Sequence, residues 1–276
     1  MRIARIGVRG QETPAVWDGS AWRDLSTVTP DVNPAFIARG VGGISVTDLP
    51  VLNDVMRFGV PLAGVGKIPC IGLNYRDHAA ETGAPEPAEP ILFFKTPDTL
   101  NGPDDDVFIP RGSVKTDWEV ELGVVIGTET HYLESPDQSL AHVAGYVVSN
   151  DVSERAYQLD RGGQWDKGKN CDTFNPMGPW FVTADEIGDP QNLGLRLWVN
   201  GQLKQNGNTA NMIFGVAHLV WYLSQFLVLR PGDVINTGTP AGVAMGAPDQ
   251  PFLRDGDLVE LEIDGLGRMS QHFYQI

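Results

Sequence analysis

The chain has 276 residues, of which 42% are hydrophobic and 20% are charged, and its formal net charge is −15. This length and composition predict a soluble globular protein with room for one large domain and one small domain. The acidic balance argues against nucleic acids and anionic membrane surfaces as partners, and two cysteines are too few for a disulfide framework, so we expect a protein of the reducing cytoplasm.

Residues 1–65 are predicted to form a small N-terminal α+β domain. Strands are expected over 3–8 and 14–17, with an Asp18-Gly19 hairpin turn after the second, and a helix is expected over 48–57. The first nine residues contain three arginines and no apolar segment, so no secretory signal is expected. Nothing in this domain indicates chemistry.

Residues 66–276 are predicted to form a second domain, which carries the candidate site. A strand over 68–73 is followed by the helix-forming residues His78, Ala79, Ala80 and Glu81, and the helix is expected to stop at Gly83. Three of the next seven residues are prolines, which cannot continue a helix. A short helix held between two loops is typical of an active-site lid.

Strands dominate the rest of the chain. They are expected over 118–126, 143–149, 194–199 and 233–240, with a short helix over 152–159, a long loop over 160–179 and a helix over 212–227. The last helix is apolar but contains His218, so we interpret it as a core helix and not as a membrane span. Because the helices are inserted singly among strands, the fold class is α+β with a β-rich catalytic domain.

Three acidic residues alternate at the start of the strand at 118–126, namely Asp117, Glu119 and Glu121. Side chains alternate across a strand, so the three share one face and the apolar residues between them share the other. One interpretation is a half-exposed strand whose acids are partly neutralised by Lys115. However, the acidic face continues into apolar positions, where crowded carboxylates cost several kcal/mol unless a cation compensates them. The pattern therefore indicates a metal site.

A third ligand is expected from Asp151, which ends the apolar segment GYVVSND. Asp151 has an alternative role, because Asp151 and Glu154 have the spacing of a capping box for the next helix. Glu119, Glu121 and Asp151 would offer only oxygen atoms, which suits Mg²⁺ first and Mn²⁺ or Ca²⁺ after it. The sequence contains no cysteine and histidine cluster with the spacing of a zinc site.

Several segments between residues 68 and 268 resemble the fumarylacetoacetate hydrolase superfamily. They are IGLNYRDHAAETG, ILFFKTPDTLNGPDDDVFIP, DWEVELGVVIG, AGYVVSNDVSERAYQ, WDKGKNCDTFNPMGPW, VNGQLKQNGNT and LRPGDVINTGTPAGVAMG. The resemblance implies a mixed β-roll, a homodimer, and Mg²⁺ (or Mn²⁺) bound by Glu119, Glu121 and Asp151. It implies that Asp117 is not a ligand.

The resemblance also implies catalytic roles for His78 and Glu81 on the lid, a catalytic or substrate-binding role for Lys169, and substrate binding by Thr239. His78 and Glu81 are three residues apart on one helix face, so the carboxylate can orient an imidazole that takes a proton from water. An exposed pair on a surface helix would give the same pattern. Lys169 in a glycine-rich loop could be an ordinary solvated lysine, and Thr239 could belong to a simple tight turn.

Three further residues are candidates for substrate binding. Arg155 and Gln158 follow Asp151 by four and seven residues and are expected on its helix face, although Arg155 could instead be a structural ion-pair partner. Leu73 stands where some members of the superfamily carry arginine. This leaves Arg76 as a candidate to hold a substrate carboxylate, and leaves open the distal part of the substrate.

The predicted reaction is a metal-dependent hydrolysis of a carbon–carbon bond in a small anionic β-diketo acid of the acylpyruvate type. A 2,4-diketo-3-deoxy sugar acid is one candidate, and the product would be pyruvate or a related 2-oxo acid. His78 would activate water while the cation, Lys169 and Thr239 stabilise the departing enolate. Two alternatives stay open: an oxaloacetate decarboxylase or oxo-acid isomerase or decarboxylase with the same site, and a non-catalytic metal- or ligand-binding protein.

Overall fold

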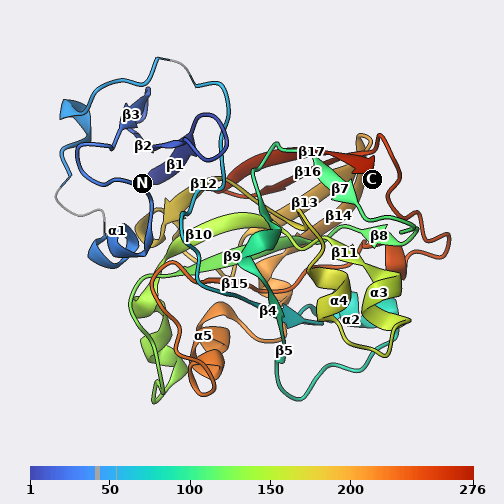
Figure 1. The fold of residues 1–276 in the computed structure, drawn as a ribbon. Coiled ribbons are helices and arrows are strands. Elements are labelled where there is room, and N and C mark those ends of the chain that lie inside the picture. The colour runs from blue at the N-terminus through green and yellow to red at the C-terminus, as the bar shows by residue number, and fades with distance from the viewer. Residues whose placement is uncertain (41–43, 54) are drawn as a thin grey trace.

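The computed structural model describes residues 1–40, 44–53 and 55–276. Within these residues the centre is a large mixed sheet (Figure 1). Its strands are, in spatial order, β3 (Trp22–Asp24), β2 (Thr13–Trp17), β1 (Arg2–Ile6), β12 (Asn175–Thr183), β10 (Val143–Asn150), β9 (Val120–Ile126), β15 (Val234–Asn236), β4 (Ile68–Gly72) and β5 (Ile91–Lys95), with β6 (Leu100–Asn101) paired to β12.

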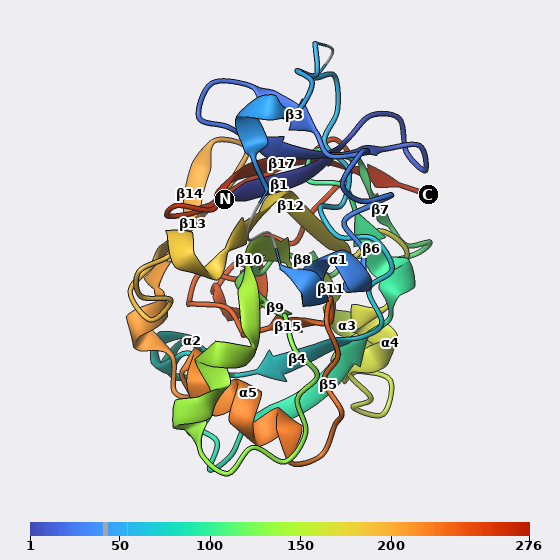
Figure 2. The same cartoon turned by 90° about the vertical axis from the view of Figure 1, so that its left-hand side faces the viewer.

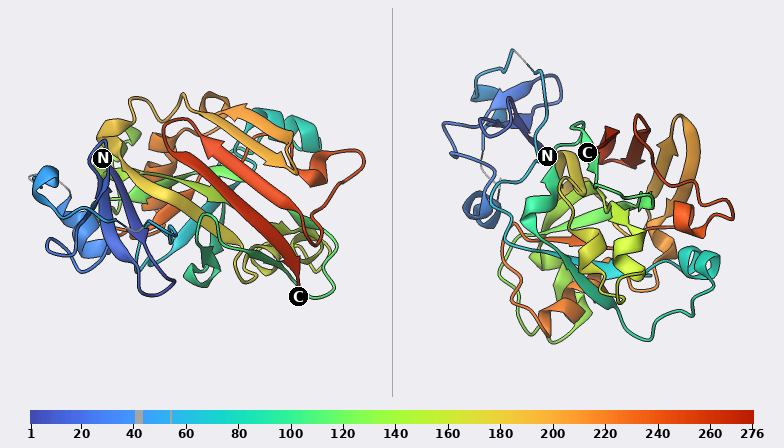
Figure 3. Two further views of the ribbon diagram at one scale, coloured as in Figure 1. Left: turned by 90° about the horizontal axis from the view of Figure 1, so that it is seen from above. Right: turned by 45° about the vertical axis from the view of Figure 1, so that its right-hand side comes forward.

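A second sheet of five strands lies across the first, as the view from above shows (Figure 3). Its strands are, in spatial order, β14 (Gln202–Asn208), β13 (Gly194–Val199), β16 (Leu258–Ile263), β17 (Gly267–Gln275) and β7 (Val107–Ile109). The main core fills the space between the sheets, where Leu122 and Val124 of β9 meet Leu197 of β13 and Leu261 of β16. Facing sheets that bury their apolar sides in this way form a stable two-layer core.

The helices are few and short. They are α1 (Pro34–Arg39), α2 (Arg76–Thr82), α3 (Arg155–Leu159), α4 (Asp166–Lys169) and α5 (Val216–Ser224). A small pair of strands, β8 (Thr116–Asp117) and β11 (Ser153–Glu154), lies beside α3. In Figure 1, α2, α3 and α4 lie together at one end of the large sheet. The fold is α+β, as the sequence predicts.

Strand β9 is buried on both faces. Val124 belongs to the core between the sheets, whereas its neighbour Val125 belongs to a second core with Val147, Phe36 and Phe181. Alternating side chains of a central strand must each find an apolar partner. This double burial explains the unbroken apolar run of β9 and gives the acidic residues at its beginning a rigid support.

The N-terminal strands extend the large sheet. Strand β1 pairs antiparallel with β12, and on its other side β2 and then β3 continue the sheet outwards. Figure 2 shows these three N-terminal strands above the rest of the sheet. Ile3 and Val16 share a core with Val147 and Phe181. The strands predicted over 3–8 and 14–17 are thus confirmed with adjusted ends, while the domain boundary at residue 65 stays a prediction.

The prediction of a helix over 48–57 is wrong for the residues of that range that the structure describes. Residue 54 lies outside the described residues. Only a short 3₁₀ turn, Val46–Asp48, forms there. Leu49 precedes Pro50, a position that disfavours the helical conformation. The chain instead pairs with β3, as Asp24 N donates to Pro50 O and Leu52 N donates to Trp22 O.

Two other elements differ from expectation. The loop predicted over 160–179 contains α4 and the first half of β12, which pairs with β10 although it contains two prolines. The helix predicted over 212–227 forms only as α5, because the N–H groups of Ile213 and Phe214 donate to Asn74 instead of continuing a helix. Among the described helices, none is both long enough and apolar enough to cross a membrane.

Candidate active site

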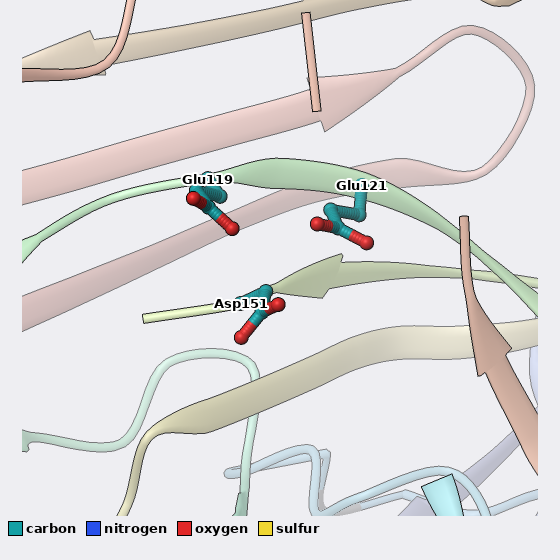
Figure 4. Close-up of side chains that lie close together, drawn as sticks. All are labelled: Glu119, Glu121 and Asp151. Carbon is teal, nitrogen blue, oxygen red and sulfur yellow. The ribbon is translucent and has the colours of Figure 1, made fainter. Parts of the chain in front are cut away.

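Three buried carboxylates meet where β9 and β10 come together. In this antiparallel pair Val120 lies opposite Asn150, so Asp151, the next residue, lies beside Glu119 and its N–H donates to Glu119 O at 2.9 Å. Glu121 lies one alternation further along the same face of β9. One oxygen each of Glu119, Glu121 and Asp151 lies within 4.8 Å of the others, as Figure 4 illustrates. A single cation can therefore contact all three.

The chain itself supplies cations to this cluster. Lys169 Nζ lies 2.6 Å from Glu119 Oε2 and 2.9 Å from Asp151 Oδ2. Arg155 Nη2 lies 2.6 Å from Glu119 Oε1, and Lys95 Nζ lies 2.8 Å from Asp151 Oδ1. The pattern of acidic residues in the sequence predicts compensation by a divalent ion alone. The structure corrects this, because protein side chains neutralise most of the charge.

Glu121 is the exception. It has no ion-pair partner among the described residues, and its Oε2 accepts a hydrogen bond from Gly238 N at 2.8 Å. Burial, followed by the charges of Asp151 and Glu119, raises the pKa of Glu121 well above its usual value. Burial would also raise the pKa of Glu119, but Lys169 and Arg155 outweigh it and lower that pKa to about 2.

The donor set therefore fits a hard divalent cation. All three side chains offer oxygen, as Mg²⁺ and Mn²⁺ prefer. Glu121 is a buried carboxylate without a counter-charge, and Asp151 Oδ1 accepts no hydrogen bond although it lies near Lys95. A buried charge without a counter-charge and a buried oxygen without a hydrogen-bond donor each cost free energy unless a ligand compensates them.

Asp117 does not join the cluster, because the strand is interrupted after it. Strand β8 ends at Asp117 and β9 begins only at Val120. The Asp117 carboxylate accepts hydrogen bonds from the N–H groups of Ala244 and Met245, and from Arg155 Nε at 2.8 Å. Its role is to hold Arg155. The alternative of a solvent-exposed acidic face is wrong, since Asp117, Glu119 and Glu121 are all buried.

The capping-box alternative for Asp151 is also wrong. Helix α3 begins at Arg155, and its N-cap is Glu154, whose side chain accepts a hydrogen bond from Ala156 N at 3.2 Å. The short strand β11 separates Asp151 from the helix. The Asp151 side chain is therefore directed to the cluster with Glu119 and Lys169 and not to a helix end.

His78 and Glu81 form a pair on α2, in which His78 is buried and Glu81 is partly buried. His78 Nδ1 lies 3.2 Å from Glu81 Oε2, and His78 is 6% exposed, so the pair is not an ordinary surface pair. Glu81 Oε1 accepts a hydrogen bond from Gly242 N at 2.9 Å. The helix is anchored before its first turn by Asn74, whose Nδ2 donates to Phe214 O and Thr237 O. These bonds fix the ring of His78 relative to the sheet.

A cavity of about 170 Å³ brings most of the predicted site residues together. Its lining includes the predicted residues His78, Glu119, Glu121, Arg155, Gln158, Lys169 and Thr239. Arg76 is not among the lining residues. Its Nη1 donates to Met212 O at 2.6 Å, and its side chain is half exposed. The structure therefore does not bring Arg76 to the cavity.

Two of the polar lining groups are already engaged. The Thr239 hydroxyl donates to Val120 O at 2.9 Å and accepts from Gln205 Nε2 at 2.8 Å. Gln158 Oε1 accepts from Arg155 Nη1 at 3.0 Å, which leaves the N–H groups of that amide as donors toward the cavity. A substrate contact by the Thr239 hydroxyl would have to replace the bond to Val120.

Lys95 is the main site residue that the sequence analysis missed. It is fully buried, and its Nζ donates to Val152 O at 3.0 Å, Phe174 O at 2.9 Å and Lys169 O at 2.5 Å. A lysine is almost never fully buried unless it is paired. A lysine at the end of the apolar run ILFFK was therefore the signal that could have identified it.

Arg155 offers a test of the ion-pair network. It joins Asp117, Glu119 and Gln158, a geometry that the single ammonium group of lysine cannot reproduce. We expect Arg155→Lys to lower the free energy of unfolding by about 2–4 kcal/mol, because it leaves a buried carboxylate unpaired. Urea denaturation measures this. As the control, Arg196→Lys alters ion pairs that are partly exposed to solvent and should change stability by less than about 1 kcal/mol. Equal effects of the two substitutions would contradict the assignment.

Comparison with known proteins shows the family of the chain. The family described as fumarylacetoacetate (FAA) hydrolase, C-terminal, matches residues 67–274. The 2,4-didehydro-3-deoxy-L-rhamnonate hydrolase of Sphingomonas sp. (strain SKA58) is 51% identical over 273 residues, which cover 98% of this chain and 95% of that protein.

Two solved structures show the same fold over the whole chain. The fumarylacetoacetate hydrolase of psychrophilic Exiguobacterium antarcticum is 33% identical with a TM-score of 0.89, and all of both chains is covered. The 2-hydroxyhepta-2,4-diene-1,7-dioate isomerase of Mycobacterium marinum is 30% identical with a TM-score of 0.77, and 100% of this chain and 98% of that one are covered. The chain therefore belongs to the fumarylacetoacetate hydrolase family.

Proposed function

We propose that the protein hydrolyses a carbon–carbon bond in a small β-diketo acid of the acylpyruvate type and releases pyruvate or a related 2-oxo acid. The observation that carries this proposal is that one cavity is lined both by carboxylates of a buried oxygen-only cluster and by a histidine oriented by a carboxylate. The name of the relative from Sphingomonas, a hydrolase of a didehydro-deoxy sugar acid, supports the same reaction class and makes such sugar acids candidate substrates.

The side chains of the site suit this chemistry. A divalent cation, Mg²⁺ or Mn²⁺, held by Glu119, Glu121 and Asp151 would supply an anchor for a 2-oxo acid and positive charge for a developing enolate. Glu81 contacts Nδ1 of His78, so Nε2 of the ring is the atom that takes a proton from water.

The bond cleavage and the proton transfers can be assigned to the cavity residues His78 and Lys169. The water oxygen forms a bond to the distal carbonyl carbon, the carbon–carbon bond breaks, and the electron pair leaves with the pyruvate part as its enolate. Lys169 Nζ is buried, and although burial would lower its pKa, Asp151 and Glu119 outweigh it and raise the pKa, so the group stays positive and favours the anion. Nε2 of His78 then returns its proton to the enolate carbon.

A second candidate is an isomerase or decarboxylase of an oxo-acid, including oxaloacetate decarboxylase. The similar structure from Mycobacterium marinum is named an isomerase, and these reactions also need stabilisation of an enolate. They do not need an activated water. The pair of the buried His78 and the anchored Glu81 favours hydrolysis over these reactions and over a non-catalytic ligand-binding protein.

The proposal is tested by a screen of acylpyruvates and oxaloacetate with and without EDTA. We expect release of pyruvate from an acylpyruvate together with the matching carboxylic acid, a loss of at least about 10³-fold on chelation, and recovery with Mg²⁺ or Mn²⁺. Carbon dioxide release from oxaloacetate alone would support the second candidate. Full turnover in EDTA would contradict the role of a divalent cation.

We further infer a homodimer with a small anionic oxo-acid as its ligand, in a cytoplasmic location. The support is the family membership and the two free cysteines, Cys70 and Cys171. Light scattering of the purified protein tests the dimer.

A further inference from the structure

The two basic side chains that line the cavity, those of Arg155 and Lys169, are both committed to buried carboxylates. Arg155 binds Asp117 and Glu119, and Lys169 binds Glu119 and Asp151. No other lysine or arginine lines this cavity in the described part of the chain. A substrate carboxylate beyond the one at the metal cluster would therefore find no uncommitted cation.

The net charge of the site also disfavours a substrate with a second carboxylate. In the network of ion pairs around the cluster, the four buried carboxylates of Asp117, Glu119, Glu121 and Asp151 meet three buried cations, Lys95, Arg155 and Lys169. Two further carboxylates lie outside this network, since Glu154 bonds to the hydroxyls of Ser113 and Thr116 and Glu81 contacts His78. One divalent cation would leave a single positive charge. A substrate with one carboxylate neutralises that charge, whereas a substrate with two leaves a negative charge in a buried site, inside a protein whose formal net charge is −15.

The rest of the lining is mainly apolar. The apolar side chains are those of Ile71, Leu73, Ala84, Phe93, Leu159, Trp165 and Met245. Among the described lining residues, the uncharged polar groups are the side chains of Thr82, Gln158 and Thr239, the imidazole of His78 and the indole N–H of Trp165. The hydroxyl of Thr82 hydrogen-bonds to His78 O at 3.0 Å. Such a wall can accept methyl groups and at most an occasional hydroxyl, but it cannot solvate a carboxylate.

The apolar wall is firmly built. The Trp165 ring lies so close to Gly72 that an added methyl group there would be 2.3 Å from it. The same ring packs edge-on against Phe93 at a centroid distance of 5.5 Å. Lys169 Nζ lies over the face of the Phe93 ring, 5.1 Å from its centroid. The apolar surface therefore begins directly beside the charged cluster, where the carbon chain of a bound oxo-acid must continue.

Leu73 is the residue of this wall at the base of the lid. It lies between the end of β4 and the start of α2, and its backbone has a φ of 51°. In this left-handed region Asn and Asp pay less than other non-glycine residues and β-branched residues pay more, whereas unbranched and γ-branched aliphatic or basic side chains pay a similar conformational cost. Substitutions of Leu73 by other unbranched or γ-branched side chains therefore compare side-chain chemistry on an equally strained backbone.

We propose that this wall makes the enzyme selective for oxo-acids with a single carboxylate and an uncharged, methyl-ended distal group, and that Leu73 is a specificity-determining residue. The turnover measurements that test this selectivity rest on the proposed function. The reaction class alone does not require the selectivity, because the same bond can be hydrolysed in mono- and dicarboxylic substrates.

The test compares substrates of the same shape but different charge. The charged substrate is 2,4-dioxoheptanedioate and the neutral isostere is 7-methyl-2,4-dioxooctanoate, with 2,4-dioxopentanoate as a short reference. We expect kcat/KM to be at least about tenfold higher for the neutral isostere than for the diacid. Values within about threefold of each other, or a preference for the diacid, would overturn the proposal.

Two variants isolate the contribution of Leu73. Leu73→Arg places a cation in the wall and should shift the ratio of kcat/KM toward the diacid by at least about tenfold. Leu73→Met keeps the size and the backbone strain without a charge, and the ratio should stay within about threefold of the wild type. An equal shift in both variants would show that packing, and not charge, sets the preference. The wild-type ratio remains a test if Leu73→Arg fails to fold.

Binding without turnover separates this inference from the proposed function. 2-Oxoheptanedioate and 7-methyl-2-oxooctanoate lack the second keto group, so they cannot be cleaved in the proposed way. Calorimetry with Mg²⁺ present should show that 7-methyl-2-oxooctanoate, whose distal group is uncharged, binds at least about tenfold more tightly than 2-oxoheptanedioate. If no acylpyruvate is cleaved but this difference is found, the proposed function falls and the selectivity stands. If cleavage occurs and the difference is missing, the selectivity falls alone.

Discussion

Replacing Glu121 with glutamine is expected to abolish binding of the divalent cation and turnover, while making the metal-free protein more stable. Glu121 is the carboxylate of the cluster without an ion-pair partner in the described chain, and its charge repels Glu119 and Asp151. Glutamine keeps a carbonyl oxygen to accept the hydrogen bond from Gly238 N. We expect a gain of about 1–3 kcal/mol in the free energy of unfolding measured in EDTA.

The gain should depend on pH in a defined direction. Because the pKa of Glu121 is raised on folding, the folded protein binds more protons than the unfolded chain, and this group destabilises the metal-free fold increasingly as the pH rises above the usual glutamate value. Glutamine carries no such penalty. The stabilisation should therefore be larger near pH 8 than near pH 5, as measured by urea denaturation at both values.

Glu119→Gln is the matched comparison, with the opposite sign. Glu119 is bonded to Arg155 and Lys169, so its neutral analogue leaves two buried cations poorly compensated. We expect this variant also to lose the cation, but to lower the free energy of unfolding by about 2–4 kcal/mol. Calorimetry with Mg²⁺ and denaturation in EDTA measure the two effects. Unchanged Mg²⁺ affinity in either variant would contradict its assignment as a ligand.

Replacing His78 with glutamine is expected to lower kcat by about 10²–10⁴-fold with little change in Mg²⁺ affinity. The imidazole is held by Glu81 and lines the cavity, but it is not one of the oxygen donors of the cluster. The loss is the typical contribution of a general base. Steady-state kinetics at saturating Mg²⁺, together with calorimetry, separate turnover from metal binding.

The control for this variant is His218→Gln on α5. His218 is a half-buried histidine that stacks on Phe214, burial lowers its pKa, and it does not line the cavity. Its replacement should leave kcat within about twofold of the wild type. A wild-type kcat in His78→Gln, or a similar loss in both variants, would remove the proton-transfer role from His78.

The parts of the site that local sequence patterns describe were predictable. The acidic residues alternate at the beginning of an apolar strand, and Asp151 follows another apolar strand, so their meeting required only that β9 and β10 be neighbours. The helix with His78 and Glu81 was bounded by a glycine and by prolines. Roles for these residues beyond their geometry came from the resemblance to the family and stay predictions.

The remaining features depend on contacts between distant segments. Lys95 neutralises Asp151 from 56 positions away in the chain, and Asp117 is turned to Arg155 by a break in the strand that alternation alone does not reveal. The strand β12 forms in spite of its prolines because β10 and β1 pair with it on both sides. Tertiary pairing decides such elements, and local propensity is then overridden.

The most direct test of the account is a crystal structure of the protein with Mn²⁺, located by its anomalous scattering. We expect one strong peak within about 2.0–2.4 Å of an oxygen atom of each of Glu119, Glu121 and Asp151. Two results would contradict the claim that these three carboxylates form one cation site. One is the absence of a peak at the cluster, and the other is an Mn²⁺ ion bound elsewhere while Glu121 contacts only Gly238 N.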